Sequence, residues 1–283
     1  MMRSVLTLLV FSVMGFVVYA FNAPTDVHDV KRHAPYTRDA VMYGSVDKIK
    51  AGFVSDEYIY GGIVSHHLLA AVDIARFYAS FADQDIDTII LVGPNHEGQG
   101  TEKIAVPTLD FETPWGDVEL NQRLIQKLVD ENVVVVDDAA FVGEHSISVQ
   151  TPYIKYYIPE ATIVPIVLKK HIDRQSLVAL STALSDIRDN RTVVIASVDF
   201  SHHTDKATGN KNDEKSIQTI SEFDMDGLYT LNIDSPNSIL VLLTYLKMID
   251  ATLFNYWRQN AADILQSPDY QDVTTYLFAF FQK

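Results

Sequence analysis

The hydrophobic pattern from residue 58 onward alternates between short apolar runs and stretches with helical spacing. Residues 88–92 are apolar throughout after Thr88, as is typical of a strand covered on both faces. Residues 68–82 (LLAAVDIARFYASFA) instead repeat apolar positions every three or four residues, which predicts a helix. Further strands are predicted at 58–65, 104–107, 133–136, 162–168, 193–198 and 273–282. Further helices are predicted at 119–131, 146–157, 174–189, 213–228 and 235–248. This alternation predicts an α/β domain over 58–283 with a mainly parallel sheet and helices on both faces.

The first residues predict targeting rather than structure. Arg3 precedes an apolar stretch, and Val18-Tyr19-Ala20 offers the small residues that a signal peptidase reads. Residues 1–20 are therefore expected to be a signal peptide or, if uncleaved, an N-terminal membrane anchor, because roughly 17–25 apolar residues span a bilayer. We expect an exported, extracytoplasmic protein whose only membrane contact is this segment. Residues 21–57 are polar and mixed, and we interpret them as a linker or N-terminal arm.

Charge and cysteine content exclude several functions. The 283 residues include 37 acidic and 22 basic side chains, a formal charge of -15. Such a surface repels phosphate backbones, so we expect no nucleic-acid partner. The chain has no cysteine, which excludes disulfides, zinc–thiolate sites and a cysteine nucleophile. A bound metal would need histidine, carboxylate, tyrosine or backbone oxygen ligands.

Histidines follow the ends of three predicted strands. They are His66 and His67 after 58–65, His96 after 88–92, and His202 with His203 after 193–198. The carboxyl ends of parallel strands meet at one edge of a sheet, where ligands bind in open α/β folds. A single loop histidine is usually just solvated, but three strand ends with histidine favour a shared site. Imidazoles with a carboxylate bind Fe(II), Zn(II), Cu(II) or Mn(II).

Two acidic residues next to these histidines are open to two interpretations. Asp199 is expected to orient His202 by hydrogen bonding, or else to close the turn after its strand. Glu144 either hydrogen-bonds His145 or caps the helix that follows. Histidines outside the metal ligands are candidates for acid–base work near neutral pH.

Five segments in order resemble the Memo-like proteins, also called the protein B component of the AmmeMemoRadiSam system. The segments are LVGPNH, TPWGDVEL, EHSISVQTPYI, IVPIVL and DFSHH, and the resemblance covers about residues 58–281. It implies a single domain with a central mixed sheet, similar to class III, LigB-type extradiol dioxygenases, which are non-haem iron enzymes. It also implies that His66 and His96 bind a metal and that His145 and His202 lie at the same pocket.

The sequence departs from the family pattern in two places. SHHLLA stands where the family has PHAGY, so the choice between His66 and His67 stays open. The family cysteine precedes a helix that matches DSPNSILVLL, which puts Asp234 at its position. The implied ligand set is then His66, His96 and Asp234. Alternatively, Asp234 is only the N-cap of that helix, a role that Ser235 could also fill.

The expected function is a non-haem metal-dependent oxidoreductase of dioxygenase type. We expect a divalent metal, with Fe(II) first and zinc or copper as alternatives, since a carboxylate in place of a thiolate disfavours copper(I). His145, His202 and Asp199 are the expected catalytic residues. Two alternatives remain: a non-catalytic protein that binds metal, a small molecule or a peptide in the same cleft, and a zinc-dependent hydrolase with an activated water. The sequence indicates neither the substrate nor the oligomeric state.

Overall fold

The computed structural model describes residues 32–283 except 53–54 and 268–269. The predicted signal peptide or anchor at 1–20, and the arm as far as residue 31, lie outside these residues. Within the described part, no helix is both long and apolar enough to cross a membrane.

An eight-stranded sheet forms the centre of the described domain, in the order β6-β4-β7-β3-β8-β2-β10-β9. The strands are β2 Gly61–Val64, β3 Thr88–Pro94, β4 Ile104–Val106, β6 Val135–Val136, β7 Thr162–Leu168, β8 Thr192–Ser197, β9 Thr252–Asn260 and β10 Thr275–Gln282. The pairs β7–β3, β3–β8, β8–β2 and β4–β6 are parallel, whereas β4–β7, β2–β10 and β10–β9 are antiparallel. The predicted α/β domain with a mixed, mainly parallel sheet is confirmed.

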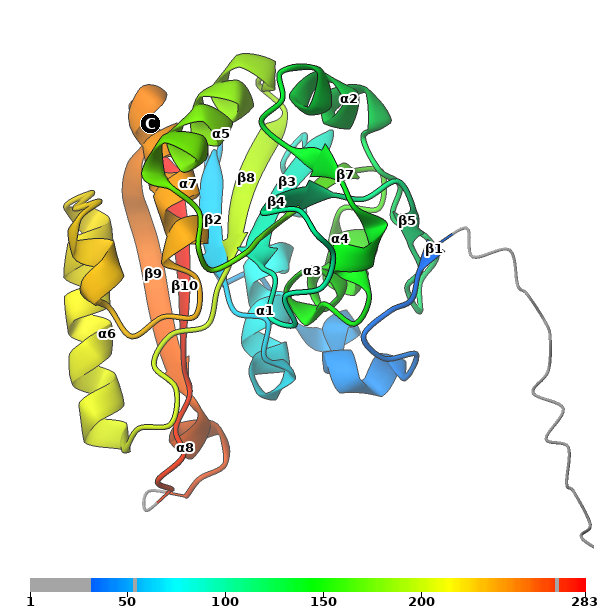
Figure 1. Ribbon diagram of the computed structural model, residues 1–283. Helices are drawn as coiled ribbons and strands as arrows, with labels where there is room; N and C mark the ends of the chain where they lie inside the picture. The colour runs from blue at the N-terminus through cyan, green and yellow to red at the C-terminus, as the bar shows by residue number, and fades with distance from the viewer. Residues whose placement is uncertain (1–31, 53–54, 268–269) are drawn as a thin grey trace, which may run out of the picture. The chain divides into compact units, whose positions relative to one another are not determined.

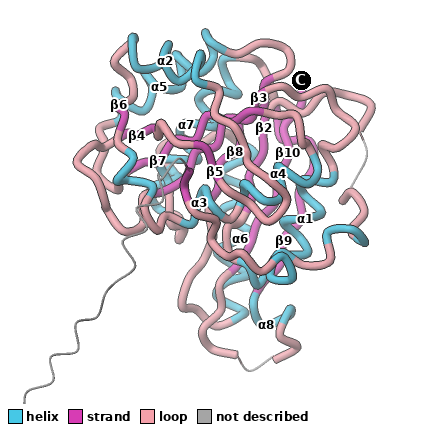
Figure 2. The backbone as a smooth tube through the Cα atoms, turned by 90° about the vertical axis from the view of Figure 1, so that its right-hand side faces the viewer, coloured by secondary structure: helices cyan, strands magenta, loops and turns pink. Residues whose placement is uncertain are grey.

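Helices cover both faces of this sheet. They are α1 Ala71–Ala79, α2 Gln122–Asp130, α3 His145–Ser148, α4 Gln150–Tyr157, α5 Arg174–Ile187, α6 Lys206–Ser221, α7 Pro236–Met248 and α8 Ala261–Ile264. Figure 1 shows α5, α6 and α7 on one side of the sheet and α1, α3 and α4 on the other, and Figure 2 looks onto the second side. The apolar run of β3 is completely buried between the two layers, as its sequence predicts.

Two glycines of β2 let helices approach the sheet closely. A Cβ on Gly61 would lie 2.9 Å from Leu246 of α7, and one on Gly62 would lie 2.6 Å from Phe77 of α1. Successive residues of a strand face opposite sides, so the pair admits one helix on each face. This close packing fixes α7, whose first turn borders the site described below.

Two regions differ from the predicted elements. The helix expected at 213–228 is α6, Lys206–Ser221, because Asp205 caps it by accepting a hydrogen bond from the Thr208 backbone N–H. The first turns of α6 consist largely of polar residues, so no apolar periodicity indicated where the helix begins. The edge strand β9 was not predicted, and its side chains are alternately exposed and half-buried, which gives a weak apolar signal.

The described part of the N-terminal arm packs onto the domain. A short strand, β1 Arg32–His33, pairs in parallel with β5 Asp110–Phe111. Tyr43 is completely buried, and its hydroxyl donates to the Thr37 carbonyl. Fixed in this way, the arm places the Tyr36 ring 6.1 Å from that of His145, measured between ring centroids.

Asp213 of α6 provides a test of the packing between α6 and β10. Its buried carboxylate accepts a hydrogen bond of 2.6 Å from the Thr275 hydroxyl, and burial raises its pKa to about 6. The fold therefore favours the protonated acid, and stability is lost as the pH rises from about 4 through 6. We expect Asp213→Asn to stabilise the protein by about 1–2 kcal/mol at pH 7.5, and to give no gain at pH 4.

Thermal unfolding at the two pH values measures this difference. Glu214→Gln is the matched control, because Glu214 is the exposed neighbour of Asp213 and carries the same charge. This substitution should shift the free energy of unfolding by less than about 0.5 kcal/mol. A loss of stability in Asp213→Asn at pH 7.5 would show that the carboxylate is needed in its charged form.

Candidate metal centre

Three neighbouring parallel strands end at one cluster of polar side chains. His66 follows β2, His96 follows β3 and Asp199 follows β8, and the sheet order β3-β8-β2 puts these ends side by side. Two further side chains come from helix starts: His145 is the first residue of α3, and Asp234 lies two residues before α7. The strand ends thus bring together residues far apart in sequence, as predicted.

The imidazoles and carboxylates approach closely enough to share an ion. His66 Nε2 lies 3.0 Å from Asp234 Oδ2 and 3.7 Å from Asp199 Oδ2. His96 Nε2 lies 3.6 Å from the same Asp234 oxygen. The His145 ring stacks on that of His96, with 4.1 Å between centroids. His66 and Asp199 are buried, whereas His96 and His145 are partly open to solvent.

Hydrogen bonds to the other ring nitrogens orient two of the imidazoles. His66 Nδ1 is 3.2 Å from Ser197 Oγ, and His96 Nδ1 is 2.8 Å from Glu144 Oε1. Glu144 also accepts the backbone N–H of His96 at 2.6 Å, so one carboxylate fixes both the ring and the chain. Each Nε2 is left facing Asp234, and such partners are typical of metal-binding histidines.

Asp199 and Asp234 are held by the backbone. The Asp199 N–H donates to Asp234 Oδ2 at 3.1 Å, and the Asp234 N–H donates to the Asp199 carbonyl at 3.1 Å. Asp199 also accepts hydrogen bonds from the Ser65 hydroxyl and the His66 N–H. The second carboxylate oxygen of Asp234, Oδ1, is buried without a hydrogen-bond partner. A buried acceptor of this kind is available to an ion or a water molecule.

The charges in the cluster shift its pKa values in opposite directions. Burial lowers the pKa of His66, but the nearby carboxylates of Asp199 and Asp234 outweigh this effect and raise it. Burial also lowers the pKa of His96, but hydrogen bonds to Asp234 and Glu144 raise it to about 10. Burial, together with the neighbouring His66 and His96, lowers the pKa of His145 to about 4. The two imidazoles hold the pKa of Asp234 well below its usual range, against the effect of its burial.

These donors fit a divalent metal. Two groups of three residues have ligand atoms within 4.8 Å of one another: His66, His96 and His145, and His66, Asp199 and Asp234. The predicted set of His66, His96 and Asp234 draws on both groups. Nitrogen and carboxylate donors suit Fe(II), Zn(II), Mn(II) and Cu(II), and the unpartnered Asp234 oxygen is a further available donor. The buried groups can hold a metal ion; they do not identify it.

The structure decides two alternatives that the sequence left open. His66, not His67, belongs to the cluster, since His67 is exposed and accepts a hydrogen bond from the Leu69 N–H at the start of a 3-10 turn. Ser235, not Asp234, caps α7 by accepting from the Ser238 N–H. Asp234 is thus free of the capping role and faces the two histidines.

One expectation about orientation was wrong, and one of the two alternatives for Glu144 is confirmed. Asp199 was expected to orient His202, but its side chain binds Ser65 and lies beside His66 instead. His202 belongs to neither metal-compatible group of the described residues. Glu144 caps α3 through the Ser146 N–H and binds His96, while His145 is 3.8 Å away. The sequence placed Glu144 beside His145, and only the fold could reveal its bond to His96.

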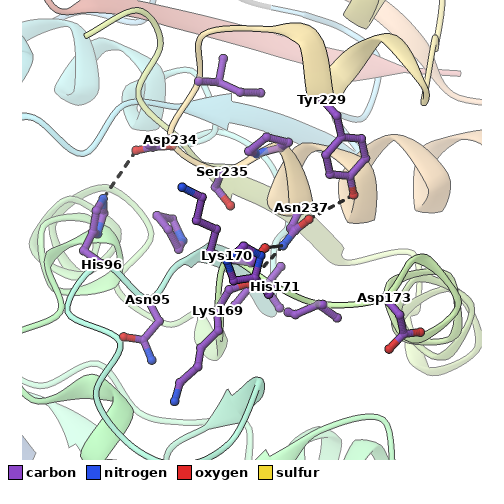
Figure 3. Close-up of a pocket in the computed structure, with 15 residues that line it drawn as sticks. Asn95, His96, Lys169, Lys170, His171, Asp173, Tyr229, Asp234, Ser235 and Asn237 are labelled. Carbon is purple, nitrogen blue, oxygen red and sulfur yellow. Dashed lines mark hydrogen bonds and ion pairs between the residues drawn. The ribbon is translucent and has the colours of Figure 1, made fainter. Parts of the chain in front are cut away.

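A cleft opens beside this cluster. It has a volume of about 850 Å³, and both His96 and Asp234 line it. Figure 3 shows the 15 residues that line it, among them Lys169, Lys170 and Asn237. The size suits a small organic molecule. A ligand in the cleft would therefore lie against two of the candidate metal ligands.

Comparisons with known proteins agree on one family. The model of the Memo-like protein family matches residues 57–276. A MEMO1 family protein of Saccharolobus islandicus is 33% identical over 177 residues, which cover 61% of this chain and 60% of the relative. That of Caldivirga maquilingensis is 33% identical over 179 residues, with 62% and 60% covered. The matches thus span about 60% of the length of these relatives.

Among solved structures, an uncharacterized protein from Escherichia coli K12 is similar with a TM-score of 0.46 and 14% identity. The match covers 78% of this chain and 99% of that one. None of these matches tests the expected likeness to extradiol dioxygenases, which stays a prediction.

Substitution of the proposed ligands provides a direct test. We expect His66→Ala, His96→Ala and Asp234→Ala each to weaken Zn(II) or Fe(II) binding by at least about 100-fold, because each removes a donor atom. Glu144→Gln should weaken it by about 10–100-fold, because the His96 ring loses its anchor. Competition with a chromophoric chelator measures these affinities. His202→Ala is the control, and a loss of binding equal to that of His96→Ala would place it in the site after all.

Proton release provides a second test of the same geometry. The raised pKa of His96, about 10, means that the metal-free site holds a proton at pH 8 that the metal must displace. We expect about one to two protons to be released per metal, and the affinity to rise with pH up to about 10. Calorimetry in two buffers of different ionisation enthalpy measures the number. Binding without proton release would show that His96 is not a ligand.

Proposed function

The chain belongs to the Memo-like protein family, and from that premise we propose that it is a non-haem metal-dependent oxidoreductase of dioxygenase type. The observation that carries this proposal is the pair of imidazole Nε2 atoms, from His66 and His96, that face one carboxylate oxygen of Asp234 beside an open cleft. Two histidines and one carboxylate are the ligand set of non-haem Fe(II) oxygenases.

The proposed ligands are His66, His96 and Asp234, with Fe(II) as the proposed ion. When bound, such an ion supplies open coordination positions for oxygen and for a chelating substrate. The chain's own residues prepare the site: Glu144 and Ser197 fix the two rings, and the buried side of the cluster excludes water from His66. The cleft gives a substrate access to the His96–Asp234 end.

His145 is the proposed proton acceptor. Burial and the adjacent imidazoles keep its pKa at about 4, so its ring is neutral at pH 7 and has a free lone pair. It stacks on His96 at 4.1 Å and is one-third exposed, which supports a position from which it would reach a group bound at a metal held by His96. Asp199 is proposed to act through His66, which it approaches within 3.7 Å. For His202 only the resemblance supports a catalytic role.

A zinc-dependent hydrolase is the second candidate, and one observation favours it. His66, His96 and His145 form a group of three imidazoles with ligand atoms within 4.8 Å of one another. Three histidines are a known catalytic zinc set, in which the fourth position holds an activated water. In that case His145 would be a ligand rather than a base. A non-catalytic cleft that binds metal and a small molecule or peptide is the remaining alternative.

We also propose that the protein works outside the cytoplasm, exported or anchored by residues 1–20, on the basis of their sequence alone. Its acidic charge supports a small-molecule or peptide ligand rather than nucleic acid.

Metal content and oxygen uptake separate these functions. We expect the full chain to bind one Fe(II) per molecule and, with catechol, to consume oxygen and form a ring-cleaved product. His145→Ala should keep the iron but lower kcat by about 10²–10⁴-fold, because it removes only the proton acceptor. His203→Ala is the matched control, because its exposed ring pairs with Asp272 and belongs to neither metal-compatible group of the described residues.

Other outcomes point elsewhere. Stoichiometric zinc that is lost in His145→Ala, with hydrolysis of an ester but no oxygen uptake, would replace the proposal with the hydrolase. Stable metal without either reaction would leave the binding protein.

A further inference from the structure

The cleft beside the candidate metal centre contains a lysine whose ammonium group has no partner among the described residues. Lys170 is exposed to the cleft, and it forms no hydrogen bond or ion pair through its ammonium group within the described chain. Figure 3 shows its side chain extending toward Asp234 and His96, whereas Lys169 points away and donates to the Gly100 carbonyl at 2.7 Å. Lys170 is therefore the cation that a ligand at the His96–Asp234 end would meet.

The backbone that carries Lys170 is clamped to the helix that follows Asp234. Asn237, buried in the first turn of α7, donates its amide to the carbonyl oxygens of Lys169 and Lys170, both at 3.1 Å. Tyr229 in turn donates its hydroxyl to Asn237 Oδ1 at 3.1 Å. One helix start thus fixes a candidate metal ligand and the base of the Lys170 side chain, so their separation is set before a ligand arrives.

The charged groups near Lys170 are paired with other residues, so its ammonium group is available to bind a ligand. Arg174, the nearest arginine in sequence, is paired with Asp226. Asp173, which also lines the cleft, caps α5 and binds the N–H and hydroxyl of Ser176. Asp234 faces His66 and His96, and a divalent ion there would be neutralised by Asp199 and Asp234 together. His171 adds a second basic side chain to the same wall.

We propose that the natural ligand of this cleft is a small organic acid, with a metal-chelating group at His96 and Asp234 and a carboxylate on Lys170. This inference rests on the proposed function for the chelating end only. In a chain with a charge of -15, an unpaired lysine next to the centre is what a carboxylate would need to enter. The volume of about 850 Å³ accommodates a molecule that spans both points.

A matched pair of probes tests the charge. They are 3-(3,4-dihydroxyphenyl)propionate and its amide, which have the same shape and differ by one negative charge. We expect the full chain, loaded with Zn(II) to prevent turnover, to bind the acid at least about tenfold more tightly than the amide, and the preference to shrink as salt rises. Calorimetry gives both affinities, and the same titration is repeated without metal.

Three variants locate the effect. Lys170→Gln should reduce the preference to below about threefold, and Lys170→Arg should keep it, because only the charge is needed. Lys127→Gln removes an equal charge from the exposed side of α2 and should change nothing. Equal binding of acid and amide by the natural chain would overturn the inference, as would binding of neither probe or a preference that survives in Lys170→Gln.

The experiments distinguish failure of the proposed anion site from failure of the proposed oxidoreductase function. Selective binding of the acid by a protein that takes up no stoichiometric metal, or that does not consume oxygen with either probe, would keep the anion site and reject the oxidoreductase. Oxygen consumption with equal affinity for both probes would do the reverse.

Discussion

The site depends on the attraction between His66 and Asp234, whose nearest side-chain atoms are 3.0 Å apart and largely buried. The carboxylates of Asp199 and Asp234 both lie beside His66 and would repel each other if no positive charge lay between them. The imidazoles or a metal ion supply this positive charge. Burying these charged groups costs desolvation free energy, and hydrogen bonds to most of the groups offset this cost. Ser65, Ser197 and Glu144 each hold one member of the cluster by a direct contact.

The sheet makes this arrangement possible by its strand order. β3, β8 and β2 are parallel neighbours, so their carboxyl ends present His96, Asp199 and His66 at one edge without any long loop. The antiparallel strands β10 and β9 extend the sheet beyond β2 and do not take part in the cluster. Gly61 and Gly62 allow α7 and α1 to pack tightly on β2, and this fixes the helix whose start carries Asp234 and Asn237.

The chain is strongly acidic, but a lysine lines its cleft. The overall charge is strongly negative, while Lys170 gives one small region of the cleft the opposite sign. The carboxylates of the cluster are committed to the imidazoles, so they do not cancel this region. The same cluster explains the divided pKa values, with His96 raised by its acidic partners and His145 lowered by burial and its basic neighbours.

The sequence by itself determined the α/β domain, the central strands and the placement of histidines after β2 and β3 at one edge of the sheet, because apolar runs and strand ends are local features. It also determined the family, through motifs that keep their order. Tertiary structure decided which of His66 and His67 turns inward, which of Asp234 and Ser235 caps α7, and that Asp199 binds Ser65 rather than His202. Edge strand β9, the bond of Glu144 to His96 and the place of Lys170 in the cleft also needed the folded chain. Each depends on contacts between residues far apart in sequence, and no local pattern encodes the direction in which a side chain at a strand end will point.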